Sequence, residues 1–518
     1  MSVNRYLIGI ILIGVIIAAF VLRFAAFDHP LSMHAAEGFR DLFVAKHALI
    51  YNEWPLSGHH NGLSTVDNSP LYYYLIIGFA LFTQSFFGVS VLFIIFQTVF
   101  VALVFLITRA LFNSIAGLVA AFFLAFSPHY IITVTSDSIW PPYFAATFVV
   151  VSLWLLWRGD KQTHRALIIA SPIAMLMAVA IHQATLALAM PYAALGLYVA
   201  YRNRFLLKHY LIAGGMFLLC AGVLFLPSLL THQGALQWGT RISDHTVIPV
   251  FDAFHLAFSQ ILYTFGLSGI TSTAAAAVII SFITLSTWFI YSSKVLRKEK
   301  VFYGLGILFL VTQICIIVFF DPEGFLRHME PALWILTVLL GVIITAPFIK
   351  QNHLMMGVSL IVCLVTLHAM VTDERMFRVY PNIGTFEYPH YQLMDRAVDA
   401  LVEDIRYIKE EHQYTDYTFF NIHALSKTGS VVSPLVFWFP LEERLDARLE
   451  KSPNTVTGNF WAKHVDDYLF YACFKQKNNY SDEQCLSDFS KQHTHHNIEK
   501  QVFYDDVLSI YRSSRLSP

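Results

Sequence analysis

The stretch that decides the fold is YLIGIILIGVIIAAFVLRFAAF (residues 6–27), followed after five residues by MHAAEGFRD (residues 33–41). An apolar run of this length is able to cross a bilayer, and it is longer than the apolar core of a typical secretory signal. No small-residue cleavage site follows it, so we interpret it as a membrane anchor. Carboxylates just outside such a segment are costly unless they are solvated or paired. Glu37 and Asp41 therefore indicate chemistry at the membrane surface.

Composition places the chain among integral membrane proteins. Of its 518 residues, 56% are hydrophobic and only 13% are charged, and apolar runs of spanning length recur along the chain. The formal net charge of −1 argues against a nucleic-acid partner, because phosphate binding requires a basic surface. The sequence carries no DNA-binding motif either. The expected environment is the lipid bilayer.

About thirteen apolar segments are long enough to be candidate spans. They lie near residues 5–27, 71–87, 89–109, 114–133, 141–157, 166–181, 183–201, 210–230, 254–271, 273–293, 301–320, 331–349 and 354–371. If segments 71–87 and 254–271 do not cross, every strongly basic connection lies on the same side of the membrane, and about eleven spans remain. Segment 71–87 is rich in Tyr and Phe, so we predict that it is an interfacial helix.

Basic residues predict the orientation of these spans. In this arrangement the connections on one side hold thirteen Lys and Arg residues, and those on the other side hold four, Arg40, Lys46, Arg241 and Arg327. The positive-inside rule then places the N-terminus in the cytoplasm and the C-terminus outside. We expect a multi-pass protein of the cell inner (plasma) membrane, mostly α-helical. Its transmembrane domain covers residues 1–371, with a first outer loop at 28–88.

The composition changes at residue 372. Residues 372–518 hold 38 charged residues, more than half of those in the chain, so a separate extracytoplasmic domain is predicted there. Apolar residues at helical spacing from Val398 to Ile408 predict an amphipathic helix, and residues 417–422 and 435–439 are typical of short buried strands. A small α/β or α+β domain is expected. Cys473 and Cys485 are predicted to form a disulfide, as an oxidising compartment allows, and two free thiols are the alternative.

Polar side chains collect in the predicted outer loops. They are Glu37, Arg40, Asp41, Asp67, Asn68, Asp137, His182, Arg241, Asp244, Asp321, Arg327, His328 and Glu330. Glu37 and Asp41 are four residues apart, so both carboxylates share one face if residues 36–51 are helical. The alternative interpretation of this cluster is a solvated helix face at the interface. In the C-terminal region, His495 and His496 lack further ligands at a suitable spacing, so no metal site is predicted.

Several short motifs occur in an order that resembles the GT-C glycosyltransferases, most closely the branch of protein O-mannosyltransferases and the lipid A aminoarabinose transferase. The motifs are Glu37-Gly38-Phe39-Arg40, Glu53-Trp54-Pro55-Leu56-Ser57-Gly58, Asn68-Ser69-Pro70-Leu71-Tyr72-Tyr73-Tyr74, Ser127-Pro128, Ser136-Asp137-Ser138-Ile139-Trp140-Pro141-Pro142, Ile181-His182-Gln183-Ala184-Thr185 and Arg327-His328-Met329-Glu330-Pro331. The likeness covers roughly residues 1–350. It rests on the order of the motifs, because each motif alone has little specificity.

This resemblance implies transfer of a monosaccharide from a polyprenyl-phosphate carrier to an acceptor hydroxyl of a lipid, glycan or protein, with inversion, on the outer side of the membrane. Such a reaction requires a carboxylate that takes the acceptor's proton and cations that stabilise the departing phosphate. Glu37 is the expected base, Asp41 is the alternative, and Asp137 is a further catalytic candidate. Substrate binding is expected from Arg40, Asp67, Asn68, Tyr72, His182, Arg241, Arg327 and His328, with Arg327 the first choice for the phosphate. This branch generally uses no metal, so no cofactor is expected.

The chain departs from the family pattern at several positions. Ala36 stands where an Asp is usual, unless the register shifts by one and Glu37 fills that position. Pro141 stands where an Asp or Asn is common, and Asn68-Ser69 replaces the Glu-Lys pair of the aminoarabinose transferase. The alternatives are a catalytically inactive scaffold, a lipid-linked sugar flippase or transporter, and an outer-leaflet polymerase or ligase. We find neither the internal repeat nor the midplane ion pair that would favour a transporter.

The charge distribution leads to a topology prediction. A topology reporter fused after residue 380 should be active only on the outer side of the membrane, because the thirteen-to-four bias of basic residues places that position outside. A fusion that is active only in the cytoplasm would overturn the predicted orientation. As a control, a fusion within residues 159–164, in a basic connection, should give the cytoplasmic signal.

Overall fold

A computed structural model describes the chain over most of its helices and strands. The described residues are 5–26, 35–52, 54–56, 58, 69–83, 86–133, 139–204, 207–231, 284, 304, 306–312, 314, 325–350, 353–372, 391–414, 420–425, 441, 444–445, 468–474, 481–492, 495–505 and 508–515. At several helix ends, including residues 35–37, 39–40 and 325–329, the description covers the backbone and not the side chains.

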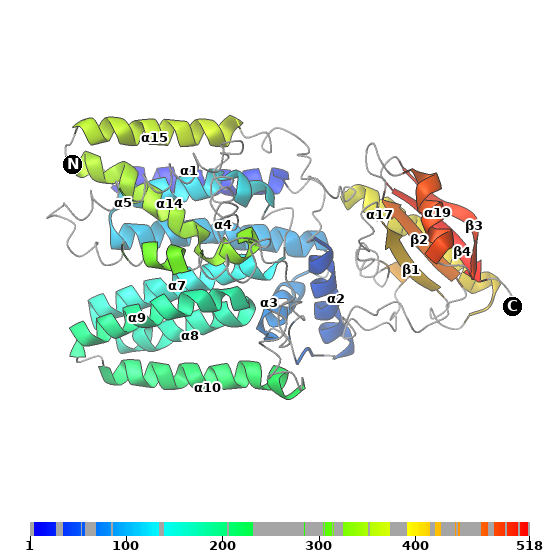
Figure 1. Ribbon diagram of the computed structural model, residues 1–518, viewed down its shortest axis with the longest axis horizontal. Helices are drawn as coiled ribbons and strands as arrows, with labels where there is room; N and C mark the ends of the chain where they lie inside the picture. Colours follow the sequence, from blue (N-terminus) through cyan, green and yellow to red (C-terminus); the bar gives the residue numbers. More distant parts are fainter. Residues whose placement is uncertain are drawn as a thin grey trace.

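The larger part of the structure is a bundle of helices that run roughly side by side (Figure 1). They are α1 (Arg5–Ala26), α4 (Phe86–Leu111), α5 (Ser114–Phe126), α7 (Pro141–Gln162), α8 (Arg165–Ile181), α9 (Leu186–Arg202), α10 (Leu207–Thr231), α14 (Phe325–Lys350) and α15 (His353–Thr372). Within the described part of the chain, five helices are long and apolar enough to cross a membrane: Tyr6–Ala26, Phe87–Leu111, Pro141–Gln162, Leu207–Leu224 and Glu330–Phe348. The segments near 254–271 and 273–293 lie outside the described residues, so the count of about eleven spans stays a prediction.

Short connections set neighbouring helices antiparallel. The side chain of Asn113 caps α5 by accepting hydrogen bonds from the backbone N–H groups of Ile115 and Ala116, both at 2.9 Å. Thr163 ends α7 in the left-handed conformation, at φ 51°, and α8 begins two residues later. An N-cap and a left-handed C-cap satisfy the backbone groups that a helix end leaves without partners.

One predicted span is interrupted in the structure. Residues 114–133 were expected to form a single segment, but α5 ends at Phe126 and a short π-helix, η1 (His129–Thr133), follows. The physical reason is Pro128, which has no N–H and restricts the residue before it to an extended backbone. Ser127 indeed has φ −63° and ψ 125°. The chain therefore changes direction just before His129.

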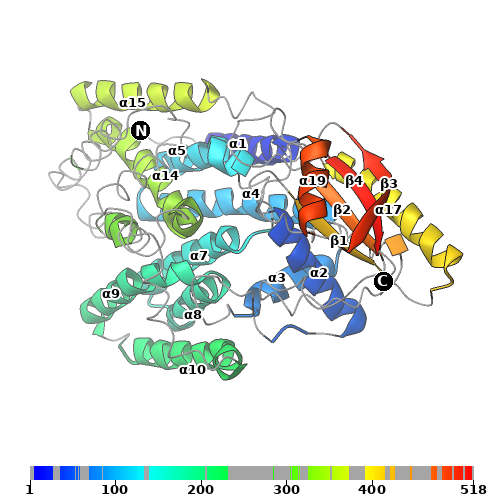
Figure 2. The same cartoon turned by 45° about the vertical axis from the view of Figure 1, so that its right-hand side comes forward.

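Two further helices lie across one end of the bundle. They are α2 (Ala35–Tyr51) and α3 (Leu71–Ala80), which lie side by side (Figures 1 and 2). Helix α2 covers residues 36–51, so the condition under which Glu37 and Asp41 share one helix face is met. The ten residues of α3 extend about 15 Å, half the thickness of the hydrocarbon core, so α3 is too short to span. The predicted boundary at residue 87 was wrong, since Phe86 and Phe87 already belong to α4.

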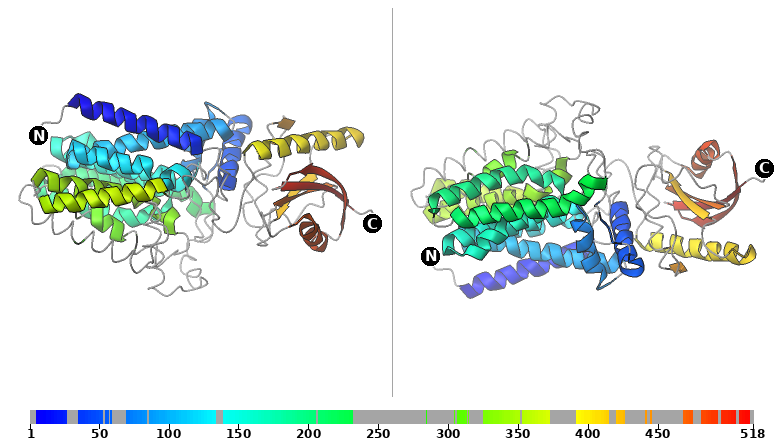
Figure 3. Two further views of the ribbon diagram at one scale, coloured as in Figure 1. Left: turned by 90° about the horizontal axis from the view of Figure 1, so that it is seen from above. Right: turned by 90° about the horizontal axis from the view of Figure 1, so that it is seen from below.

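The C-terminal part contains a four-stranded mixed sheet. Its strands are β1 (Phe420–Leu425), β2 (Tyr468–Phe474), β3 (His496–Tyr504) and β4 (Leu508–Arg515), in the order β1-β2-β4-β3. The pair β1 and β2 is parallel, and the other two pairs are antiparallel. Helix α17 (Tyr391–Glu411) covers one face of the sheet and α19 (Asp482–Gln492) the other, as Figure 3 shows. The strand expected at 435–439 lies outside the described residues.

Strand β2 faces two cores, because successive side chains of a strand point to opposite sides. Phe470 and Ala472 are buried together with the apolar face of α17. Leu469, Tyr471 and Cys473 are buried against α19. A disulfide between Cys473 and Cys485, with a Cα–Cα distance of 6.0 Å, joins β2 to α19.

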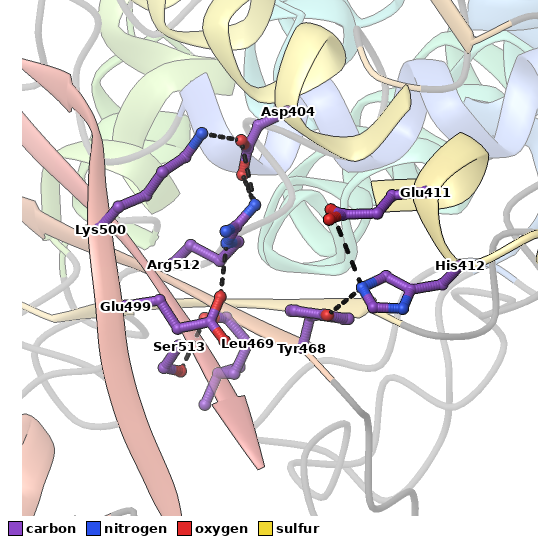
Figure 4. Close-up of polar contacts among 9 residues, drawn as sticks. All are labelled: Asp404, Glu411, His412, Tyr468, Leu469, Glu499, Lys500, Arg512 and Ser513. Carbon is purple, nitrogen blue, oxygen red and sulfur yellow. Dashed lines mark hydrogen bonds and ion pairs between the residues drawn. The ribbon is translucent and has the colours of Figure 1, made fainter. Parts of the chain in front are cut away.

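A buried carboxylate ties α17 to the far edge of the sheet (Figure 4). The side chain of Asp404, on α17, is only 4% exposed and accepts two hydrogen bonds of 3.2 Å from Nη1 of Arg512 on β4. Lys500 on β3 forms an ion pair with the same carboxylate. Arg512 also pairs with Glu499 through Nε at 2.9 Å. A buried charge that has several partners in place holds one arrangement of helix and strands.

Close packing between α5 and α14 leads to a stability prediction. A Cβ added at Gly341 would lie 2.5 Å from the carbonyl oxygen of Ala116 and 3.1 Å from the N of Ala120. Membrane helices approach this closely only over small residues. Gly341→Leu should therefore separate the two helices and lower stability by about 1–3 kcal/mol or more, measured as thermal unfolding of the purified full chain in detergent.

The matched control is Gly357→Leu on the neighbouring helix α15. A Cβ at Gly357 meets nothing within 4 Å in the described structure, so this substitution should leave the unfolding temperature nearly unchanged. Equal unfolding temperatures for both variants would contradict the close α5–α14 contact.

Candidate functional site

The candidate site lies at the end of the bundle that α2 and α3 cross, which we call the α2/α3 end. Figures 1 and 2 show that α1 ends and α4 begins there, next to α2 and α3. The sheet region lies beyond the same end in Figures 1 and 3. Helix α2, which contains the predicted motif Glu37-Gly38-Phe39-Arg40, therefore lies at this end.

Most of the predicted site residues are placed only by their position in the chain. Glu37 and Arg40 lie within α2, and Arg327 and His328 lie in the first turn of α14, each described by its backbone. Four others, Asp67, Asn68, Asp137 and Arg241, lie outside the described residues. The convergence of Glu37, Asp137 and Arg327 on one cavity stays a prediction.

Helix α2 carries ionisable side chains that are buried. Asp41 is 0% exposed, and Lys46 and His47 are buried as well. The imidazole of His47 packs against the rings of Phe43 and Tyr51, with centroid distances of 4.2 and 4.9 Å. Ionisable groups withdrawn from water are costly and concentrate at functional sites. The alternative interpretation of this segment, a solvated helix face, is wrong for Asp41, because its side chain is buried.

Tyr72 links α3 to the beginning of α7. Its hydroxyl donates a 2.6 Å hydrogen bond to the backbone carbonyl of Ile139, and its ring contacts Phe144 at a centroid distance of 5.8 Å. Ile139 has φ 27°, a conformation that a β-branched residue rarely adopts. Such backbone persists only where surrounding contacts hold it, and it is common at functional sites. Ile139 directly follows residues 134–138, which carry Asp137.

His182 lies at the junction between α8 and α9. Its backbone N–H donates to the carbonyl of Ala178 at 3.0 Å, and its own carbonyl accepts from the N–H of Thr185 at 3.0 Å. The residue is buried and ends α8, and the short 3₁₀ helix η2 (Gln183–Thr185) precedes α9. The backbone of His182 thus forms the junction, and its proposed contact with the substrate stays a prediction.

Sequence reasoning missed a buried pair in the same region. His129, the first residue of η1, and Glu330, on α14, meet through Nε2 and Oε2 at 2.7 Å. Their side chains are 2% and 1% exposed, and 201 residues separate them. π-Helical turns are rare and occur frequently at functional sites. The position of His129 directly after the Ser127-Pro128 motif was the available signal.

Arg23 is the second feature that the sequence analysis passed over. Its guanidinium is buried and donates to the carbonyls of Ala19 at 3.0 Å and of Leu124 and Ala125, both at 3.3 Å. The last two belong to the final turn of α5, where carbonyls lack helical partners and the helix dipole is negative. A single Arg within the apolar run 6–27 was the signal for this interaction.

Tyr130 connects these two features. It interacts electrostatically with both Glu330 and Arg23, and its ring lies 5.3 Å from the His129 ring. We call these four residues, Arg23, His129, Tyr130 and Glu330, the buried polar cluster. Tyr130 and Glu330 share a side-chain hydrogen bond, whereas, among the described residues, Nε of Arg23 and Nδ1 of His129 make none. Each such buried group costs about 1–3 kcal/mol, which marks the cluster as more than packing.

The described residues place no group of three or more His, Cys, Asp or Glu side chains where they would hold a metal ion. The buried polar cluster instead combines donors from Arg23 and Tyr130 with a carboxylate from Glu330. Hydrogen bonding and charge stabilisation are the chemistry that this arrangement supplies.

Comparison with known proteins bears on the family. Residues 67–230 match the family model described as dolichyl-phosphate-mannose-protein mannosyltransferase. This region includes Tyr72, the buried pair's His129, Ile139 and His182. No curated protein sequence matches the chain with significant similarity.

Comparison with solved structures bears on the fold. ArnT from Cupriavidus metallidurans in the apo state superposes with a TM-score of 0.52 at 11% identity, over 96% of this chain and 97% of that chain. The oligosaccharyltransferase of Archaeoglobus fulgidus tethered with an acceptor peptide matches with a TM-score of 0.48 at 12% identity, over 86% of this chain and 64% of that chain. The resemblance to GT-C glycosyltransferases is confirmed, by the family model over residues 67–230 and by the ArnT-like fold over nearly the whole chain.

The contact between Tyr72 and Ile139 yields a prediction on local dynamics. Tyr72→Phe removes the hydroxyl and leaves the Ile139 carbonyl without its donor, which should cost about 1 kcal/mol and speed local opening about fivefold. Hydrogen exchange of peptides that contain Ile139 and Trp140 measures this effect.

Tyr74→Phe is the matched control, because it removes a hydroxyl from the same helix that donates to the carbonyl of Pro55 at 2.9 Å and not to Ile139. Exchange at Ile139 that responds equally to both variants, or to neither, would contradict a specific role of Tyr72.

Proposed function

We propose that this protein transfers a monosaccharide from a polyprenyl-phosphate donor to an acceptor hydroxyl at the outer face of the membrane, with inversion. The chain is a membrane protein of the GT-C fold and is related to glycosyltransferases. The observation that carries the proposal is the family-model match over residues 67–230, because it includes the motifs Asn68–Tyr74 and Ser136–Pro142 and the Tyr72–Ile139 contact between them. The sugar and the acceptor are left open.

The proposed orientation has two independent supports. The first is the bias of basic residues, which places residues 372–518 outside as an extracytoplasmic domain. The second is the disulfide between Cys473 and Cys485, since disulfides persist in oxidising compartments and are rare in the cytosol. Both support our proposal that the α2/α3 end of the bundle lies at the outer leaflet of the inner (plasma) membrane.

The proposed reaction is a single displacement. The acceptor oxygen attacks the anomeric carbon of the sugar, and its proton passes to a carboxylate, for which Glu37 is the first choice. The bond between the anomeric carbon and the phosphate oxygen breaks, and its electron pair leaves with the polyprenyl phosphate. A general base and a cation near the leaving phosphate are the two contributions the protein has to make.

We assign roles to the remaining predicted residues from their positions in the sequence motifs. Arg327 stabilises the leaving phosphate, with Arg40 and Arg241 as further cations, while Asp137 and Asp41 are the other catalytic carboxylates. Burial of Asp41 supports its candidacy, because ionisable groups withdrawn from water concentrate at functional sites. Asp67, Asn68, Tyr72, His182 and His328 are proposed to line the substrate region.

The base assignment yields a kinetic prediction. Glu37→Gln keeps the size of the side chain but removes the basic oxygen, so transfer should fall by about 10²-fold or more while donor binding is largely kept. Initial rates and donor binding, measured on purified protein in lipid, test this. Glu403→Gln, on the exposed side of α17, is the matched control and should keep full activity.

Arg327→Ala separates the two proposed roles, since phosphate charge is present in the ground state and grows during bond cleavage. This variant should weaken both donor binding and turnover.

If Glu37→Gln keeps full activity, the base assignment is wrong and Asp41→Asn is the next test. A wild-type protein that binds the donor but never transfers the sugar would favour the inactive scaffold or the flippase.

A further inference from the structure

The first turn of α14 is weakly connected to the rest of its helix. Pro331 lies inside α14 and has no N–H, so the carbonyl of Arg327, four residues earlier, lacks its helical hydrogen bond. The helix after Pro331 is well held, because Ala332 and Leu333 are 0% exposed and Nε1 of Trp334 donates to the Pro331 carbonyl at 2.9 Å. The turn that carries Arg327 therefore depends on contacts outside its own helix.

The contact between Glu330 and His129 supplies this connection. It joins the last residue before Pro331 to the first residue of η1 at 2.7 Å, and both side chains are almost fully buried. A hydrogen bond is electrostatically stronger in such surroundings than in water. Glu330 lies one turn after Arg327 along α14, so its position determines where that turn sits.

The position of η1, which carries His129, is also held by contacts. Arg23 donates to the carbonyls of Leu124 and Ala125 at the end of α5, four and three residues before Pro128. It thereby holds the end of α5 against α1 immediately before η1. The chain then continues from Thr133, the last residue of η1, through residues 134–138 with Asp137 to Ile139, which Tyr72 holds through a 2.6 Å hydrogen bond.

We propose that Glu330 is a positioning residue for the reaction, acting through His129. The contact sets the first turn of α14, with Arg327, against η1, and so determines the position of the proposed phosphate-binding cation. This inference rests on the proposed function, in which Arg327 stabilises the departing phosphate. Glu330 itself is not expected to touch the substrate, because it is buried between helices.

The experiment measures phosphate recognition. The probes are a polyprenyl phosphate and the polyprenol of the same length, and the readout is the ratio of their dissociation constants on the full chain in lipid. Glu330→Gln should reduce the preference for the phosphate about tenfold, which corresponds to about 1.4 kcal/mol. His129→Gln should do the same, and the double variant should lose no more than either single variant, because the two residues act as one unit.

Thr337→Val is the matched control on the same helix. Thr337 is buried, and its hydroxyl donates to the carbonyl of Trp334 at 2.7 Å. This variant tests whether any buried polar change in α14 lowers phosphate preference. It should affect thermal stability alone.

Hydrogen exchange of peptides that span Phe325 to Ala332 provides a second readout that does not depend on the donor. Glu330→Gln should speed exchange there, and Thr337→Val should not. The proposal is overturned if Glu330→Gln leaves the exchange of these peptides unchanged. It is also overturned if the wild type prefers the phosphate and Glu330→Gln keeps that preference, or if the losses of the two single variants add up in the double variant. Faster exchange in Glu330→Gln with a wild type that binds phosphate and alcohol equally would refute the proposed function and leave the positioning of this turn supported.

Discussion

A polar group buried among membrane helices has no water to bind, so its partner has to come from within the protein. Arg23 shows the consequence: its guanidinium is buried, and it donates to three backbone carbonyls, two of them at the end of another helix. Glu330 meets His129 under the same constraint. These contacts determine how α1, α5, η1 and α14 meet at the α2/α3 end, and the candidate site depends on that arrangement.

The two ends of the bundle satisfy their polar groups differently. At the end away from α2 and α3, the contacts join helices that are near one another in sequence. Asp160 of α7 pairs with Arg202 of α9, which is 42 residues later in the chain. At the α2/α3 end the contacts span 67 residues for Tyr72 and Ile139, 101 for Arg23 and Leu124, and 201 for His129 and Glu330. Residues so far apart in the sequence are neighbours only in the folded state. A site built from several distant segments requires such contacts.

Local patterns predicted much of the secondary structure. The apolar periodicity from Val398 to Ile408 identified α17, and the region of β1 was recognised from its apolar run. Strand β3 was missed because most of its residues are exposed and its register is interrupted twice, so no alternation is visible. The break between α5 and η1 was also missed, since the hydropathy of residues 114–133 is continuous and only Pro128 marks it.

The sequence by itself determined that the chain is a helical membrane protein with a charged C-terminal region, because hydropathy and charge are properties of local segments. It also determined the family resemblance, which depends on the order of motifs along the chain. Only the tertiary structure decided that Arg23, His129, Tyr130 and Glu330 form one buried cluster and that Tyr72 holds Ile139. The physical reason is that a hydrogen bond between distant segments leaves no periodic trace in either one, and it exists only once helix packing has removed both groups from other partners.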